Sequence, residues 1–236
     1  MRCLVTAGNT REPIDRVRDW GNIFTGNTGL SIARALSARG HAPVLTTNRQ
    51  HIEQLALEAS PIAAEHFTTH SELRERIGRV LQHQRIDAVF MTAAVSDYSP
   101  DGVYEIVQRT MGTDGTQQWT VRDVHQGKVS SAHPRIAVTG TPTAKLIDLF
   151  RSEWRFDGLL VKFKLEVGIG RERLIEIGRS SRVTSGADFL VANTLEMTTG
   201  ESAGAYLIGE NTCEWIARAD PPDRLAALAV ARVRAD

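Results

Sequence analysis

The sequence of 236 residues predicts an α/β fold, namely a doubly wound, mostly parallel, Rossmann-like sheet with an inserted antiparallel excursion. Short apolar runs alternate with segments of helical periodicity along most of the chain. Residues 87–94 are an unbroken small and apolar run, as expected for a strand that helices cover on both faces. Residues 98–140 interrupt the alternation with β-like segments and turns, which indicate antiparallel strands.

The chain opens with a short strand that leads into two glycine-bearing loops. Cys3-Leu4-Val5 ends in small, turn-forming residues around Gly8 and Thr10, and the second loop, residues 22–29, runs directly into a helix predicted over residues 28–39. This order of strand, glycine loop and helix presents backbone N–H groups to a phosphate. It therefore favours a nucleotide-using enzyme. The long stretch between the two loops places polar groups over the same crevice.

The remaining elements follow in alternation. The expected strands are residues 41–47, 63–67, 87–94, 158–166 and 188–193, the expected helices are residues 52–59, 71–83 with a Ser71 cap, 143–154, 171–181 and 221–234, and a terminal hairpin joins residues 205–209 to 213–218. No repeat or shift in composition divides the chain, so we predict one nucleotide-binding domain over residues 1–236. The insertion at residues 98–140 is typical of a site cover or a dimerisation arm.

Composition and charge exclude several classes of protein. Lys plus Arg and Asp plus Glu number 28 each, so the formal net charge is zero, which argues against a nucleic-acid-binding protein. Cys3 and Cys213 form neither a disulfide framework nor a metal cluster, and we expect no metal site built from protein side chains. With no leader and no long apolar stretch, we expect a cytoplasmic protein without a membrane span.

Ligands of open parallel sheets bind outside the carboxyl ends of the strands. Those ends carry small or polar residues here, at positions 8–10, 48, 93–97, 164–166 and 193. The standard nucleotide signatures G-x-x-x-x-G-K-[ST] and G-x-G-x-x-G are absent, and Asn48-Arg49 stands where an acidic residue binds a ribose. The sequence also lacks a nucleophile elbow, zinc-spaced ligands and a close carboxylate pair.

Six segments carry a family resemblance. They are LVTAGNTREPIDRVR, the N-x-x-T-G-x-x-G of residues 22–29, TAAVSDYSP at 92–100, GKVSS at 127–131, KFKLE at 162–166 and ADFLVAN at 187–193. In this order they resemble the phosphopantothenate–cysteine ligase family (phosphopantothenoylcysteine synthetase), in its stand-alone form without a flavin decarboxylase domain. The resemblance covers nearly the whole chain, and the six segments together are specific.

The resemblance implies an enzyme of coenzyme A biosynthesis. It activates the carboxylate of 4′-phosphopantothenate with CTP or ATP and Mg²⁺, releases pyrophosphate, and passes the acyl group to the amine of cysteine. Such chemistry needs positioned donors and cations more than a nucleophilic side chain. The resemblance further implies a homodimer, with residues 98–140 reaching across the interface.

Individual roles follow from the same resemblance. The catalytic residues are Asn22, matched to an asparagine whose amide holds the acyl-nucleotidylate, and Lys128, matched to a lysine in a segment that closes over the phosphates. The nucleotide-binding residues are Gly8, Thr10, Thr25, Gly26, Gly29, Ala94, Asp97 and Phe163, and the substrate-binding residues are Arg18 and Asn193. The alternative for each is structural: a turn or cap for the Asn and Asp residues, a surface charge for Arg18 and Lys128, and core packing for Phe163.

The sequence departs from the family pattern at charged positions. Phe24-Thr25-Gly26-Asn27 stands where many relatives have Ser-Ser-Gly-Lys, and Lys162 replaces a common glycine. Serines at 180, 181 and 185 stand where some relatives have lysines. These departures leave the choice between CTP and ATP open. They also leave open a paralogue with altered catalysis or a non-catalytic nucleotide- or flavin-binding relative. A short-chain NAD(P) reductase is a further alternative, although the Tyr-x-x-x-Lys pair is absent.

Overall fold

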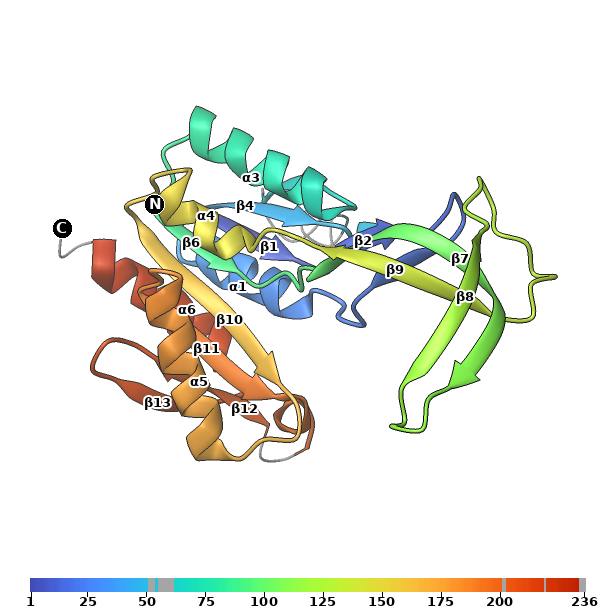
Figure 1. Ribbon diagram of the computed structural model, residues 1–236. Helices are drawn as coiled ribbons and strands as arrows, with labels where there is room; N and C mark the ends of the chain where they lie inside the picture. Colours follow the sequence, from blue (N-terminus) through green and yellow to red (C-terminus); the bar gives the residue numbers. More distant parts are fainter. Residues whose placement is uncertain (51–53, 55–61, 201–202, 219, 234–236) are drawn as a thin grey trace.

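The computed structural model describes residues 1–50, 54, 62–200, 203–218 and 220–233. Its centre is an eight-stranded sheet in the order β13-β12-β11-β10-β6-β1-β4-β5 (Figure 1). The strands are β1 (Arg2–Ala7), β4 (Ala42–Thr47), β5 (Ala63–His66), β6 (Ala88–Met91), β10 (Leu159–Glu166), β11 (Phe189–Thr194), β12 (Gly204–Ile208) and β13 (Cys213–Ala217). Neighbouring strands from β11 to β5 pair in parallel. Strand β12 pairs antiparallel with β11, and β13 pairs antiparallel with β12. The predicted α/β class is confirmed.

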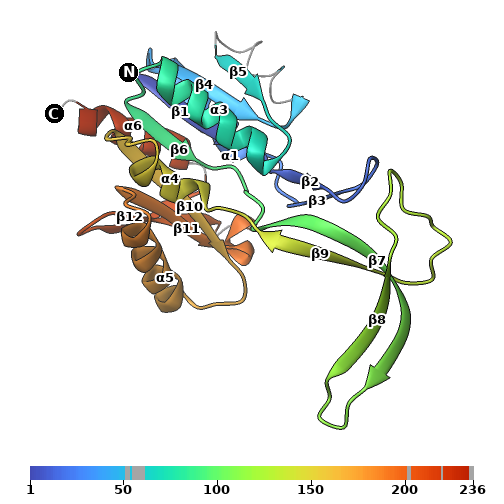
Figure 2. The same ribbon diagram turned by 45° about the horizontal axis from the view of Figure 1, so that its top comes forward.

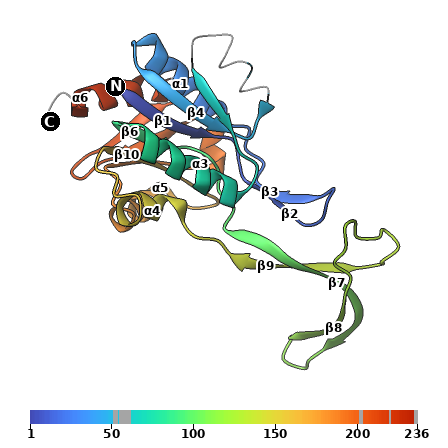
Figure 3. The same ribbon diagram turned by 90° about the horizontal axis from the view of Figure 1, so that it is seen from above.

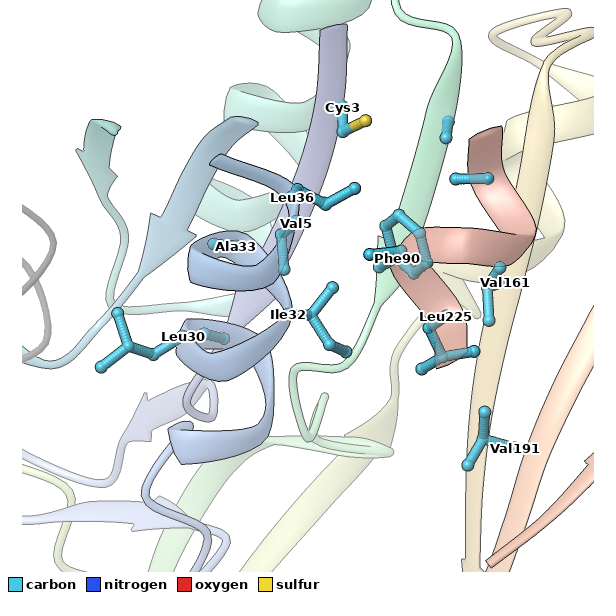
Figure 4. Close-up of a cluster of buried hydrophobic side chains, with 14 of the residues drawn as sticks. Cys3, Val5, Leu30, Ile32, Ala33, Leu36, Phe90, Val161, Val191 and Leu225 are labelled. Carbon is cyan, nitrogen blue, oxygen red and sulfur yellow. The ribbon is translucent and has the colours of Figure 1, made fainter. Parts of the chain in front are cut away.

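Helices cover both faces of this sheet. On one face lie α1 (Asn27–Ala38) and α6 (Pro221–Val233), and on the other lie α3 (His70–His83), α4 (Leu146–Ser152) and α5 (Arg171–Thr184). Val5, Phe90 and Val161 occupy paired positions of β1, β6 and β10 and pack against Ile32 and Leu225 of the first pair of helices (Figure 4). The residues that alternate with these along the same strands pack against the helices on the opposite face. Because both faces are covered, these strands are apolar throughout.

One helix begins earlier than predicted. The N-cap of α3 is Thr69, not Ser71: the Thr69 side chain accepts a hydrogen bond from the Glu72 backbone, and the Glu72 side chain bonds back to Thr69. This capping box satisfies backbone donors in the first turn of the helix and fixes its start. The helix expected over residues 52–59 lies outside the described residues.

The excursion forms a separate antiparallel sheet, as predicted. Its order is β8 (Gln117–Asp123), β7 (Tyr98–Met111) and β9 (Ile136–Pro142), and β7 is longer than the short strands expected. Figures 2 and 3 show it projecting from the main sheet, at the end of the molecule opposite the chain termini. The small hairpin of β2 (Arg11–Pro13) and β3 (Asp19–Gly21) lies beside its base. No helix in the described part of the chain is long and apolar enough to cross a membrane.

Candidate functional site

Strands β1 and β6 lie at the point where the order of the sheet reverses. Strands β4 and β5 follow β1 on one side, whereas β6 and β10 lie on the other. Backbone pairing continues past the strand ends, because the Thr10 amide donates to the Ala94 carbonyl at 3.1 Å and the Ala94 amide donates to the Gly8 carbonyl at 2.9 Å. Open α/β sheets bind their ligands at such a point.

The N-terminus of α1 sits directly on these two strand ends. A Cβ atom at Gly29 would lie 2.7 Å from both Ala7 Cβ and Thr92 Oγ1, so only glycine permits this approach. Gly26, in the left-handed conformation with φ 87°, caps the helix without a side-chain hydrogen bond. The first N–H groups of α1 are therefore available to an anion at the edge of the sheet.

A network of polar side chains holds the loop that carries Asn22. Buried Asn9 donates from Nδ2 to the Asn22 carbonyl, and its Oδ1 accepts from Asn48 Nδ2 at 2.8 Å. Arg49 Nη2 donates to the same Oδ1 at 3.1 Å and to the Phe24 carbonyl at 2.9 Å. The sequence analysis placed Asn48 at a strand end and noted Asn48-Arg49 as a departure from the dinucleotide pattern, but it missed this role in holding the loop.

A cavity of about 810 Å³ opens beside the network, at the carboxyl ends of β6 and β10 and against α4 and α5. Of the predicted site residues, Asn22, Ala94, Asp97 and Phe163 line it. The Asn22 side chain reaches toward the strand end, with Nδ2 3.4 Å from the Ala94 carbonyl oxygen. Four residues from three separate segments of the sequence thus meet at one cavity.

The cavity wall carries more charge than the sequence analysis predicted. The additional ionic groups are Lys145, Asp148, Lys162, Lys164, Glu166, Arg173 and Glu176. Lys145 Nζ pairs with Asp97, Lys164 Nζ lies 3.0 Å from Glu166 Oε1, and Arg173 Nη1 lies 2.7 Å from Glu176 Oε2. Only Lys162 and the polar strand end at residues 164–166 signalled any of this in the sequence, because α4 and α5 reach the cavity through tertiary packing.

Other predicted residues support the site without lining the cavity. Thr10 is buried, and its Oγ1 accepts a 2.7 Å hydrogen bond from the Ser96 amide, which holds the segment after β6. Gly8 has φ 86°, and a Cβ there would overlap the Asn48 side chain. Thr25 is exposed in the loop before α1, and Asn193 lies half-buried at the carboxyl end of β11.

Arg18 and Lys128 belong to a second assembly, at the β2–β3 hairpin. The buried carboxylate of Asp15 accepts from Arg18 Nη2 at 2.6 Å and from the Val129 amide at 3.1 Å, and Arg18 Nη2 also donates to the Val129 carbonyl at 2.6 Å. Lys128 is exposed in the loop thus anchored and does not line the cavity of its own chain. Hydrogen bonds, led by that from the Val17 amide, hold the pKa of Asp15 well below its usual range.

The fold and the cavity at the reversal of its sheet define an open α/β ligand-binding domain. Residues 1–114 match the model of the DNA/pantothenate metabolism flavoprotein C-terminal domain.

Relatives of known name extend the match over the rest of the chain. The coenzyme A biosynthesis bifunctional protein CoaBC of Thermococcus kodakarensis is 30% identical over 217 residues, which are 92% of this chain and 47% of that protein. The CoaBC protein of Mycobacterium tuberculosis is 26% identical over 208 residues, or 82% of this chain and 42% of that protein. The chain therefore spans about half the length of the curated relatives it matches.

Two solved structures share the fold. The DNA/pantothenate metabolism flavoprotein from Streptococcus pneumoniae superposes with a TM-score of 0.77 at 26% identity, covering 100% of this chain and 99% of that one. A Cab2 mutant in complex with phosphopantothenate-cysteine superposes with a TM-score of 0.69 at 15% identity, covering 98% of this chain and 85% of that one. The second likeness is one of fold alone.

Proposed function

We propose that this chain joins 4′-phosphopantothenate to cysteine in coenzyme A biosynthesis, through an acyl-nucleotidylate formed from CTP or ATP. The observation that carries the proposal is the meeting of Asn22, Ala94, Asp97 and Phe163 at one cavity beside the N-terminus of α1. The relatives named CoaBC support the pathway, and the compound bound to the Cab2 neighbour supports the substrate class.

In the first step, a carboxylate oxygen of phosphopantothenate attacks the α-phosphorus of the nucleotide. A new P–O bond forms, and the bond from the α-phosphorus to the bridging oxygen of pyrophosphate breaks. The free N–H groups at the start of α1, after Gly26, bind phosphate oxygens and stabilise the charge that develops on them. The contribution of the protein to this step is positioning and electrostatics.

In the second step, the cysteine amine attacks the carbonyl carbon of the acyl-nucleotidylate. The C–N bond forms, the nucleoside monophosphate leaves with the electrons of the C–O bond, and the nitrogen loses a proton. Asn22 donates from its side-chain amide to an oxygen of the intermediate, since its loop is fixed by Asn9 and its amide lies at the cavity wall. A preorganised neutral donor of this kind stabilises developing negative charge.

When bound with the triphosphate, Mg²⁺ would neutralise part of its charge. Among the described residues, no group of three or more His, Cys, Asp or Glu side chains gathers as a metal site. Mg²⁺ commonly keeps several of its waters and is held mainly by phosphate oxygens. A cavity without such a cluster of side chains fits an ion bound in this way. Asp97, already paired with Lys145, is the cavity carboxylate that we expect to contact the nucleotide.

Lys128 is proposed to act across a homodimer. Its loop is anchored to the hairpin and projects away from the cavity of its own chain, whereas the adjoining sheet exposes Met111, Trp119 and Val121. Exposed apolar side chains on one sheet are typical of an interface. A second chain docked there brings Lys128 toward the partner's nucleotide. A cytoplasmic location is part of the same proposal.

The test is pyrophosphate release by the purified protein with Mg²⁺ and either CTP or ATP, with and without 4′-phosphopantothenate. Release that requires phosphopantothenate supports the ligase and identifies the nucleotide. The second candidate is a non-catalytic nucleotide-binding relative, which the absence of a lysine from Phe24-Thr25-Gly26-Asn27 favours. Nucleotide binding by folded protein without any pyrophosphate release would establish that alternative.

A further inference from the structure

Lys162 differs from the other cations of the cavity wall. Each of those lies within ion-pair distance of a carboxylate, as described above. For Lys162, no such carboxylate occurs among the described residues, and its Nζ donates to the Ser181 carbonyl at 3.3 Å. Asp148 acts on this ammonium from a longer distance. The side chain is half-buried, so its remaining N–H groups are poorly hydrated donors that face a cavity.

The surroundings of Lys162 select against a phosphate. Ser181 lies in the last turn of α5, where the carbonyl ends of the helix carry partial negative charge. An anionic phosphate is disfavoured beside those carbonyls, whereas the N-terminus of α1 offers free N–H groups to it. The expected partner of Lys162 is therefore a neutral hydrogen-bond acceptor.

Two serines complete this end of the cavity. Ser180 and Ser181 line it from α5, and a hydroxyl group can both donate and accept. The bases of CTP and ATP each carry an exocyclic amino group beside a ring nitrogen, so they present a donor next to an acceptor. A lysine donor beside serine hydroxyls matches that pattern, and the cavity of about 810 Å³ has room for a nucleotide.

We propose that Lys162, together with Ser180 and Ser181, binds the base of the nucleoside triphosphate, with the ammonium donating to a ring nitrogen or carbonyl oxygen. This inference rests on the proposed function, because it takes a nucleotide as the ligand of the cavity. It assigns the base to the α5 end of the cavity and the phosphates to the side where Asn22 and Phe24 of the loop before α1 line it.

Burial lowers the pKa of Lys162, and the neighbouring ammonium groups of Lys164 and Lys145 lower it further. The charge of Asp148 opposes these effects. The contact should therefore weaken as pH rises, at a lower pH than for an ordinary lysine.

The experiment measures the binding of three probes to wild type and Lys162→Met. The probes are the triphosphate (CTP or ATP), the corresponding nucleoside, and tripolyphosphate. We expect Lys162→Met to weaken the triphosphate and the nucleoside by the same factor, about 10- to 100-fold, and to leave tripolyphosphate unchanged. The control is Arg85→Met, which removes one positive charge from an exposed ion pair with Asp87 outside the cavity lining, and should change binding by less than about threefold.

Each contrary outcome has a separate meaning. Weaker binding of tripolyphosphate but not of the nucleoside would show that Lys162 holds phosphate and would overturn the inference. Unchanged binding of all three probes to Lys162→Met would overturn it while leaving the proposed function intact. Failure of the wild-type protein to bind either triphosphate would overturn the proposed function itself. Because the substitution removes a poorly hydrated charge, the variant should remain folded, which circular dichroism checks.

Discussion

The Asp15 carboxylate accepts a hydrogen bond of 3.1 Å from the backbone amide of Val129, which lies 114 residues further along the chain. The contact joins the hairpin after β1 to the loop that contains Lys128. Val129 is itself buried with Val103 and Val124, so the polar contact and the apolar cluster fasten the same loop. The Asp15 carboxylate thus helps to fix the position of the loop around Lys128.

Removing this carboxylate should release the loop. In Asp15→Asn, the charge-assisted acceptor for the Arg18 side chain and the Val129 amide is lost, so we expect trypsin to cleave at Lys128 about 10-fold faster. The matched control is Asp123→Asn, which removes a nearby carboxylate whose one side-chain hydrogen bond among the described residues is to the His125 amide. Equal cleavage rates in both variants would contradict the anchoring role.

The same carboxylate predicts an acid dependence. Because the pKa of Asp15 is lower in the folded protein than in the unfolded chain, its contribution to stability is present above about pH 4 and is lost as pH falls toward the folded pKa. The free energy of unfolding of wild type should therefore exceed that of Asp15→Asn at neutral pH, and the difference should shrink below pH 4. Denaturant unfolding at several pH values measures it, and a constant difference would refute the assignment.

Gly29→Ala should displace α1 from the ends of β1 and β6. The new Cβ would lie 2.7 Å from Ala7 Cβ and 2.8 Å from the Thr6 carbonyl oxygen, neither of which can yield without moving a buried strand. We expect a loss of about 1–3 kcal/mol in the free energy of unfolding. Gly170→Ala is the control, since a Cβ there would meet no packed neighbour within 4 Å, and it should cost only about 0.5 kcal/mol through its place at the N-cap of α5. Equal losses in the two variants would contradict the close packing.

The two cysteines should differ sharply in reactivity. Cys3 is buried in β1, and burial raises the pKa of its thiol to about 12, whereas Cys213 is exposed on β13. Iodoacetamide at pH 8 should modify one thiol per folded chain, because the thiolate is the reactive form. Mass spectrometry of Cys213→Ser should then show no label before unfolding. Labelling of Cys3 in the folded variant would show that β1 is not buried as described.

Sequence patterns located most of the fold because they are local. Apolar runs and helical periodicity reveal strands and helices within a few residues, and even the missed start of α3 was readable in the spacing from Thr69 to Glu72. The pairing of Lys145 with Asp97 joins positions 48 residues apart and depends on how α4 docks. The anchoring of Val129 by Asp15 is equally non-local. A single sequence offers no pattern for such contacts.

The central claim is that Asn22 and the cavity beside it join phosphopantothenate to cysteine. The most direct measurement is mass spectrometry of the product formed from 4′-phosphopantothenate, cysteine, Mg²⁺ and CTP or ATP, by wild type and by Asn22→Asp. The account predicts the amide-linked product with wild type, and at least about a 100-fold slower yield with a folded variant, since an acid that ionises replaces a neutral donor. No product from folded wild-type protein with either nucleotide, or an equal yield from Asn22→Asp, would contradict it.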